Sequence, residues 1–199
     1  KYIIILSICS AFTSLYYFFK LELITQIFGV LVFMLLLLYT LPFFPNKRNA
    51  RNWKGIKIYI VSLCWVGVTV LLPLINAEVA FTFDVLLLSI QRFLLIFVLI
   101  LIFEIVDFHT DDPHLQTVPQ QIGVEKTKLL GYLLLGVLLA LEFLYDANQD
   151  YVPLAFKFIV SCSVALFLYF ADENKSRYYA SFWVESIPIF WWVLLLFLR

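Results

Sequence analysis

Long runs of apolar residues, separated by short polar segments, dominate this chain. Seven runs approach or exceed the about 20 apolar residues that a helix needs to cross a bilayer, and they cover residues 2–19, 23–44, 57–76, 84–106, 128–145, 151–171 and 178–198. A soluble domain of 199 residues could not cover so much apolar surface, since 63% of the residues are hydrophobic and only 14% are charged. We therefore predict an integral all-α membrane protein, a polytopic helical bundle of about seven spans that forms a single domain over residues 1–199.

The loops between these runs differ in charge. One side carries most of the cations, which are Lys47, Arg48, Arg51, Lys54, Lys57, Lys126, Lys128, Lys175 and Arg177, whereas the loops of the other side offer only Lys20. Lys and Arg gather in cytoplasmic loops, so we predict that the basic side faces the cytoplasm. The net charge is zero, and we expect a lipid bilayer but no nucleic acid among the partners.

One polar segment, EIVDFHTDDPHLQTVPQQIG over residues 104–123, interrupts the apolar pattern. In a helix that continues to about residue 111, Glu104, Asp107 and Asp111 would share one face, because they follow an i, i+3, i+7 spacing. Carboxylates that converge near a membrane repel one another, so a positive partner is expected. Hard oxygen ligands suit Mg²⁺, which keeps several waters and bridges to substrate phosphates. We predict that these three acids bind Mg²⁺.

The sequence gives less support for other metal ligands. His109 and His114 are five residues apart, a spacing that does not place them on one helical face, so no zinc site is predicted. Asp112 precedes Pro113, and it is either a further ligand or only a turn residue. The cysteines are isolated within apolar runs and are expected to be packing residues; they are Cys9, Cys64 and Cys162.

The basic loop over residues 45–57 and the acidic segment lie on the same side of the membrane, because an even number of predicted spans separates them. A carboxylate-bound Mg²⁺ and a cluster of Lys and Arg are together able to neutralise a diphosphate. At least one of Lys47, Arg48 and Arg51 is predicted to contact such a group; the alternative is that these cations only set the topology. A lipid with a diphosphate head and an apolar tail fits this arrangement.

The acidic segment resembles the second aspartate-rich motif of the UbiA superfamily of intramembrane prenyltransferases. In that family a D-x-x-D-x-x-x-D pattern ends a helix and a T-L-P-x-x-x-G element follows it, and residues 104–111 and 117–123 match these two elements here. The stretch LYTLPFFPNKRNARNWKGIKIYIVSLCW is similar to the family's Tyr-Pro and basic loop. Glu104 stands where Asp or Asn is more usual, and PHLQ stands where a Gly-Lys-Arg element is common.

The resemblance implies a Mg²⁺-dependent enzyme that transfers an isoprenyl group from an isoprenyl diphosphate to an aromatic or other lipophilic acceptor. Asp107 and Asp111 would be the catalytic, metal-binding residues, with Glu104 as a further metal ligand. The substrate-binding residues implied are Tyr39, Lys47, Arg48, Arg51, Asn52 and Glu104. Family members have nine spans and a first motif, N-D-x-x-D-x-x-x-D, that is missing here. We expect two further spans and the ligands of a second metal upstream of Lys1, and expect this chain alone to be inactive.

Two other classes of membrane protein are alternatives. In a non-catalytic or transport-type protein, Arg92, Lys157 and Glu185 would mark a solute or proton path within the membrane. In the enzyme, Arg92, Glu142 and Lys157 are instead expected to pair with one another or to reach the interface. A CDP-alcohol phosphotransferase also uses paired acidic motifs, but its D-x-x-D-G-x-x-A-R pattern does not occur in this sequence.

Overall fold

The computed structural model describes residues 2–41, 55–144 and 151–197. The protein is 83% helical, and the described residues contain no strand, so the predicted all-α fold is confirmed. The α-helices are α1 (Tyr2–Phe18), α2 (Leu23–Thr40), α3 (Ile56–Val66), α4 (Leu72–Asn76), α5 (Phe83–Val106), α6 (Val118–Ile122), α7 (Val124–Ala140), α8 (Tyr151–Phe170) and α9 (Ile187–Phe197). Short π- or 3₁₀-helical segments are η3 (Gly67–Leu71), η4 (Pro113–Leu115), η5 (Leu141–Leu144) and η6 (Tyr179–Val184).

Four helical stretches are long and apolar enough to cross a membrane. They are Leu23–Thr40, Ile56–Asn76, Phe83–Val106 and Val124–Leu144. Two further stretches, Tyr2–Phe18 and Leu154–Phe170, are apolar but shorter. The described residues therefore support four spans by length and composition, and the count of about seven remains a prediction.

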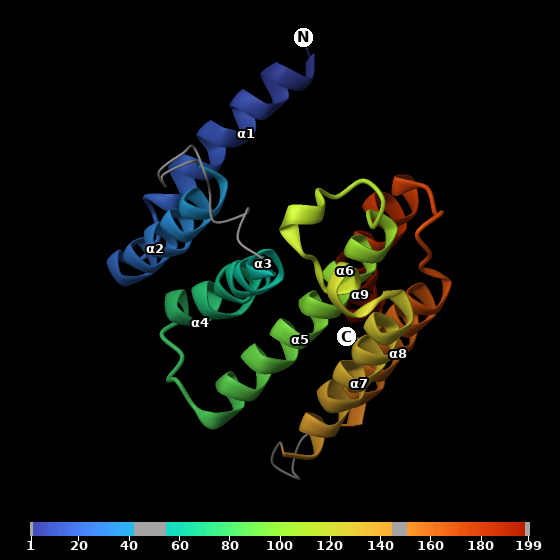
Figure 1. Ribbon diagram of the computed structural model, residues 1–199. Helices are drawn as coiled ribbons and strands as arrows, with labels where there is room; N and C mark the ends of the chain where they lie inside the picture. Colours follow the sequence, from blue (N-terminus) through green and yellow to red (C-terminus); the bar gives the residue numbers. More distant parts are fainter. Residues whose placement is uncertain (1, 42–54, 145–150, 198–199) are drawn as a thin grey trace.

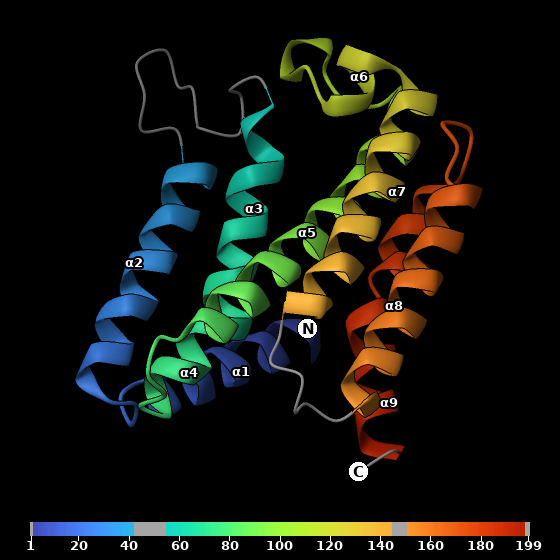
Figure 2. The same cartoon turned by 90° about the horizontal axis from the view of Figure 1, so that it is seen from below.

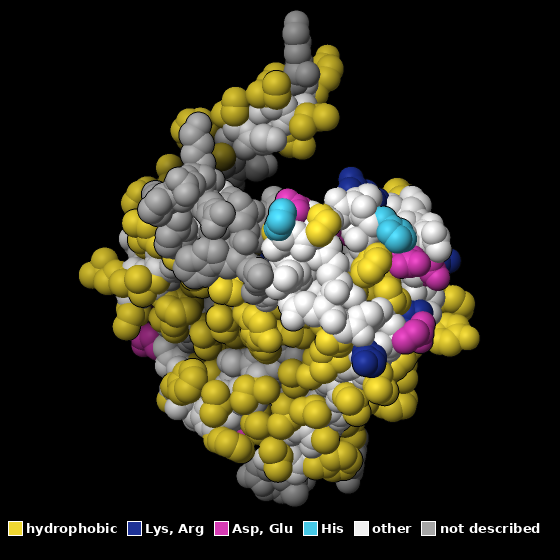
Figure 3. Space-filling view, in the orientation of Figure 1, with side chains coloured by type: hydrophobic (Ala, Val, Ile, Leu, Met, Phe, Trp, Pro, Cys, Tyr) yellow, Lys and Arg dark blue, Asp and Glu magenta, His cyan; other side chains and the backbone are white. Residues whose placement is uncertain are grey.

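Large apolar side chains cover the outside of the bundle. Ile3 is 80% exposed, Phe12 70% and Leu133 60%. In Figure 3 apolar side chains spread over most of the face shown, whereas many of its charged and histidine side chains gather near one end. Continuous apolar surface of this kind marks a membrane or protein contact, and a chain with four candidate spans is consistent with a lipid environment.

Helix α5 forms the centre of the bundle (Figures 1 and 2). It packs against α3 on one side and α7 on the other, α7 packs against α8, and α8 against α9. Helix α5 is apolar almost all round, which suits a buried helix. Its inward residues form most of one core cluster, which also includes residues of α7, α8 and η6; examples are Val98, Ile102, Leu135, Val164 and Val184. Helix α6 lies near the end of the bundle at which α3 begins and α5 ends (Figure 2).

Helices α7 and α8 approach each other closely at Gly131. A Cβ atom at this position would lie 2.5 Å from Leu168 Cδ2, and Leu168 is fully buried. The substitution Gly131→Leu is therefore expected to lower the free energy of unfolding by about 1–3 kcal/mol through overpacking. The measurement is the thermal midpoint of the purified protein. Gly136 is the matched control on the same helix, because a Cβ there meets nothing within 4 Å, and equal losses for both Leu variants would contradict the prediction.

Candidate functional site

The end of α5 determines how the acidic residues are presented. The helix ends at Val106, and the carbonyl of Asp107 accepts hydrogen bonds from the backbone N–H groups of Thr110, at 2.9 Å, and Asp111, at 2.8 Å. The Thr110 hydroxyl also donates to this carbonyl, a local bond that competes with helix continuation, and Pro113 disfavours helix at the residue before it. The prediction that Glu104, Asp107 and Asp111 share one face of a helix is therefore wrong, because Asp111 lies beyond the helix.

Asp111 faces the beginning of α3. Its Oδ2 atom lies 3.9 Å from Nζ of Lys57, and the side chains of Asp111 and Lys57 are 15% and 25% exposed. This Oδ2 atom is buried and accepts no hydrogen bond from the described residues. Glu104 lies close enough to Lys57 and Asp111 for both charges to act on it. Glu104 and Asp111, two of the three predicted acids, therefore lie within electrostatic reach of each other, with Lys57 beside Asp111.

Glu104 is only 2% exposed, and its position explains the start of α6. Its Oε2 atom accepts a hydrogen bond of 3.0 Å from the backbone N–H of Val118, the first residue of α6. The N–H groups at a helix N-terminus lack partners within the helix, and a carboxylate there is favoured. The Gln120 side chain completes this start, since its Oε1 accepts from the Thr117 N–H at 3.0 Å. The carboxylate of Glu104 thus joins α5 to α6.

Asp107 faces a different cation. Its Oδ1 atom accepts hydrogen bonds from Nε of Arg177 at 3.2 Å and from the Thr110 hydroxyl at 3.3 Å. Nearby, Nε2 of His109 lies 3.5 Å from Oε2 of Glu173. These contacts tie the end of α5 to the segment between α8 and η6. Lys57 belongs to the basic loop that was predicted to lie beside the acids, but it was not singled out as a contact of Asp111. Arg177 was predicted only as a topology signal, and its contact with Asp107 was missed.

The remaining predicted site residues belong to α2 and the loop after it. Tyr39 is buried in the last turn of α2, at the same end of the bundle as α6 (Figure 2). Lys47, Arg48, Arg51 and Asn52 lie outside the described residues. Immediately before α3, the backbone N–H of Gly55 donates to the Leu115 carbonyl at 3.1 Å. The basic loop therefore ends against the polar segment that follows α5.

The carboxylates offer a limited set of metal ligands. Within residues 2–41, 55–144 and 151–197, no three His, Cys, Asp or Glu side chains are grouped closely enough to hold a metal ion. Asp111 Oδ2 is a buried carboxylate oxygen without a hydrogen-bond donor among these residues. Mg²⁺ typically uses one or two carboxylates together with waters and substrate phosphates, so the chemistry of Asp111, with Glu104 beside it, fits this ion.

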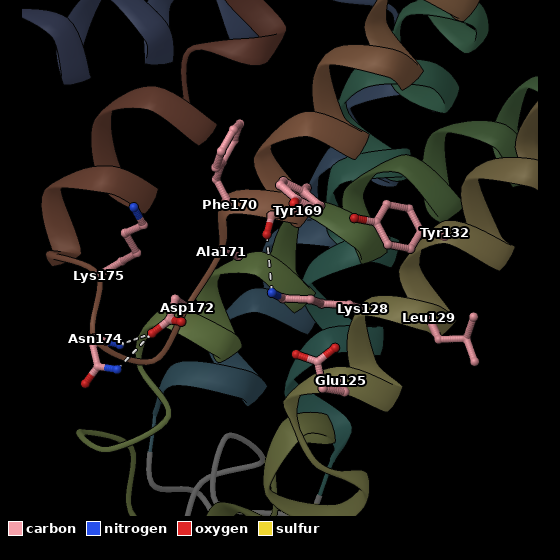
Figure 4. Close-up of a pocket in the computed structure, with 10 residues that line it drawn as sticks. All are labelled: Glu125, Lys128, Leu129, Tyr132, Tyr169, Phe170, Ala171, Asp172, Asn174 and Lys175. Carbon is pink, nitrogen blue, oxygen red and sulfur yellow. Dashed lines mark hydrogen bonds between the residues drawn. The ribbon is translucent and has the colours of Figure 1, made fainter.

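A separate groove of about 890 Å³ lies between α7 and α8. None of the predicted site residues that the structure describes lines it. Figure 4 shows Lys128 extending from α7 to donate to the Tyr169 carbonyl, at 3.3 Å, near the end of α8. The backbone N–H of Asn174 donates to Asp172 and holds the pKa of that carboxyl below its usual range. The groove carries Lys128 and Lys175 opposite Glu125 and Asp172, so the charges of its lining balance.

No protein-family model, curated protein or solved structure matches this chain. The fold and the site define its class: an all-helical protein with four candidate membrane-spanning helices and a cluster of acids and cations where α5 ends.

Proposed function

We propose that this chain is part of a UbiA-like intramembrane prenyltransferase, which moves an isoprenyl group from an isoprenyl diphosphate to an aromatic or other lipophilic acceptor. One observation carries the proposal: Lys57, the last cation of the basic loop, lies 3.9 Å from Asp111 of the acidic segment. This contact between one cation of the basic loop and one acid of the acidic segment supports a diphosphate site built from both segments. The type of reaction is inferred from the resemblance of the motifs to those of the UbiA superfamily. We place the site at the cytoplasmic face of a bacterial inner membrane.

The cations of the site have a direct role in this reaction. The bond between the allylic carbon and the diphosphate oxygen breaks, and the diphosphate leaves with the electron pair. Lys57 and Arg177 stabilise the negative charge that grows on this leaving group. Arg177 is well placed for this, because its side chain is 71% exposed and its guanidinium is always charged. An electron-rich acceptor then attacks the allylic carbon and loses a proton.

The acids have the complementary role. Asp111 offers a buried carboxylate oxygen that accepts no hydrogen bond from the described residues, and Glu104 is the acid next to it. Asp111 would hold Mg²⁺, with Glu104 as the nearby second acid, and the ion would supply positive charge to the diphosphate when both are bound. Asp107 instead positions Arg177 through their hydrogen bond of 3.2 Å. The apolar bundle is the natural environment for the isoprenyl tail.

The test uses the full-length protein in membranes. Membranes that contain it are incubated with radiolabelled prenyl diphosphates and an extract of lipophilic acceptors, with Mg²⁺ or with a chelator. We expect a radiolabelled lipid product that requires both the protein and Mg²⁺. Absence of a product with prenyl donors of every length tested, while the protein is folded in the membrane, would contradict the proposal.

A further inference from the structure

A second group of polar side chains lies inside the bundle, away from the acidic segment. This inner polar cluster consists of Gln91 and Arg92 of α5, Glu142 of η5, and Lys157 and Ser161 of α8. Arg92 is the tenth residue of α5, so it lies about 13 Å along the helix from its start. In a span that crosses a hydrocarbon core of about 30 Å, this position is inside the membrane.

Three members of the inner polar cluster satisfy one another. Glu142 Oε2 accepts from Lys157 Nζ at 2.7 Å and from Gln91 Nε2 at 2.9 Å. Lys157 Nζ also donates to Gln91 Oε1 at 3.1 Å, and Gln91 Nε2 donates to the Leu138 carbonyl at 3.2 Å. The charges of Glu142 and Lys157 cancel, which is the pairing predicted for these two residues from the sequence. The triad of Gln91, Glu142 and Lys157 therefore has no net charge.

Arg92 remains outside this triad. Its guanidinium carbon lies 4.4 Å from the centre of the Trp191 ring, and no carboxylate of the described residues forms a salt bridge with it. Its Nε atom is buried and donates no hydrogen bond to the described residues. Because a guanidinium keeps its charge in proteins, the described cluster carries one uncompensated positive charge. Arg92 is partly buried, and a charge in such a position is unfavourable unless it is paired.

A second unsatisfied group faces the same space. Ser161 is 3% exposed, and its hydroxyl has no hydrogen-bond partner among the described residues. Arg92, Ser161 and Trp191 line one cavity of about 20 Å³, whose walls are otherwise largely apolar. This volume has room for about one water-sized particle. A water could accept hydrogen bonds from both groups, but it would leave the charge of Arg92 uncompensated.

We propose that this cavity binds a single small monovalent anion of the halide class, held by Arg92 and the Ser161 hydroxyl. A halide accepts N–H and O–H donors, fits a space that excludes larger anions, and cancels the remaining charge of the inner polar cluster. The apolar walls, together with Trp191, keep water away from it and strengthen the electrostatic attraction. The bound anion joins α5 to α8 and α9, so it stabilises the packing of these three helices.

The experiment measures the thermal midpoint of the full-length protein in nanodiscs at constant ionic strength. Sodium chloride and sodium bromide are titrated against sodium gluconate, whose anion is too large for the cavity. We expect a saturable rise of about 3 °C or more with either halide. Ser161→Ala is expected to weaken the halide affinity about fivefold or more, and Arg92→Gln to abolish the response.

Ser163→Ala is the matched control. Ser163 lies on the same helix but does not line the cavity, and its hydroxyl donates to the Ile159 carbonyl at 2.9 Å, so this variant should keep the full halide response. Equal midpoints in chloride and gluconate would overturn the proposal, since a cavity that holds only water is indifferent to the salt. A full response in Ser161→Ala would also overturn it. If Arg92→Gln does not fold, the comparison of the two serine variants decides.

Discussion

Replacing Asp111 by Asn is expected to lower the rate of Mg²⁺-dependent prenyl transfer by the full-length protein about 100-fold or more. Asn has nearly the same shape as Asp, but it lacks the negative charge that a hard cation needs. The affected oxygen is buried and accepts no hydrogen bond from the described residues, so it is available to contact a cation. Loss of one preorganised charged contact at a transition state costs about 10²–10³ in rate. The initial rate of radiolabelled product formation, measured across a Mg²⁺ titration, gives the result.

Asp112→Asn is the matched control for this experiment. Asp112 is the next residue, but it is exposed and its Oδ1 accepts the backbone N–H of His114 at 2.9 Å, which makes it a turn residue. We expect its rate to stay within about twofold of the unmodified protein. The thermal midpoint of both variants must be unchanged for the comparison to report on chemistry. Full activity with unchanged Mg²⁺ dependence in Asp111→Asn would mean that Asp111 serves only as the ion-pair partner of Lys57.

The helices could be predicted from the sequence because apolar runs of span length have few alternatives in a membrane protein. The local backbone geometry within each helix, however, depends on single residues. The run over residues 57–76 forms α3, η3 and α4 in one continuous stretch, with the π-helical segment Gly67–Leu71 ahead of Pro73. Proline lacks the N–H that an α-helix requires, and both proline and π-type segments are known irregularities within otherwise continuous helices. Hydrophobicity alone does not show such a change.

The candidate site was only partly predictable. The acid residues and the cation-rich loop followed from composition and topology, but their geometry assumed that α5 continues to residue 111. Asp107, Thr110 and Pro113 were signals against this, since each favours the end of a helix. Contacts across the fold were out of reach, because no local spacing connects Asp107 with Arg177, 70 positions further along the chain.

Removing the carboxylate of Glu104 is expected to have the largest effect on stability among the acids of the site. Glu104→Ala leaves the backbone N–H of Val118 without its acceptor and opens space beside a side chain that is only 2% exposed. These two losses together are expected to lower the free energy of unfolding by about 3 kcal/mol. The measurement is an unfolding titration of the purified protein, with the thermal midpoint as a second readout.

Glu104→Gln separates the two roles that Glu104 has in this structure. Gln keeps an oxygen that accepts from Val118, so this variant is expected to lose less than about 1 kcal/mol of stability. Because Gln has no charge, it would still weaken any contact with Mg²⁺ that involves Glu104, and prenyl transfer would fall while the fold remains intact. If Glu104 only holds the start of α6, both stability and activity stay near those of the unmodified protein. A Gln variant as unstable as the Ala variant would contradict the capping role, because it would show that the charge of Glu104, and not the hydrogen bond to Val118, maintains this end of the bundle.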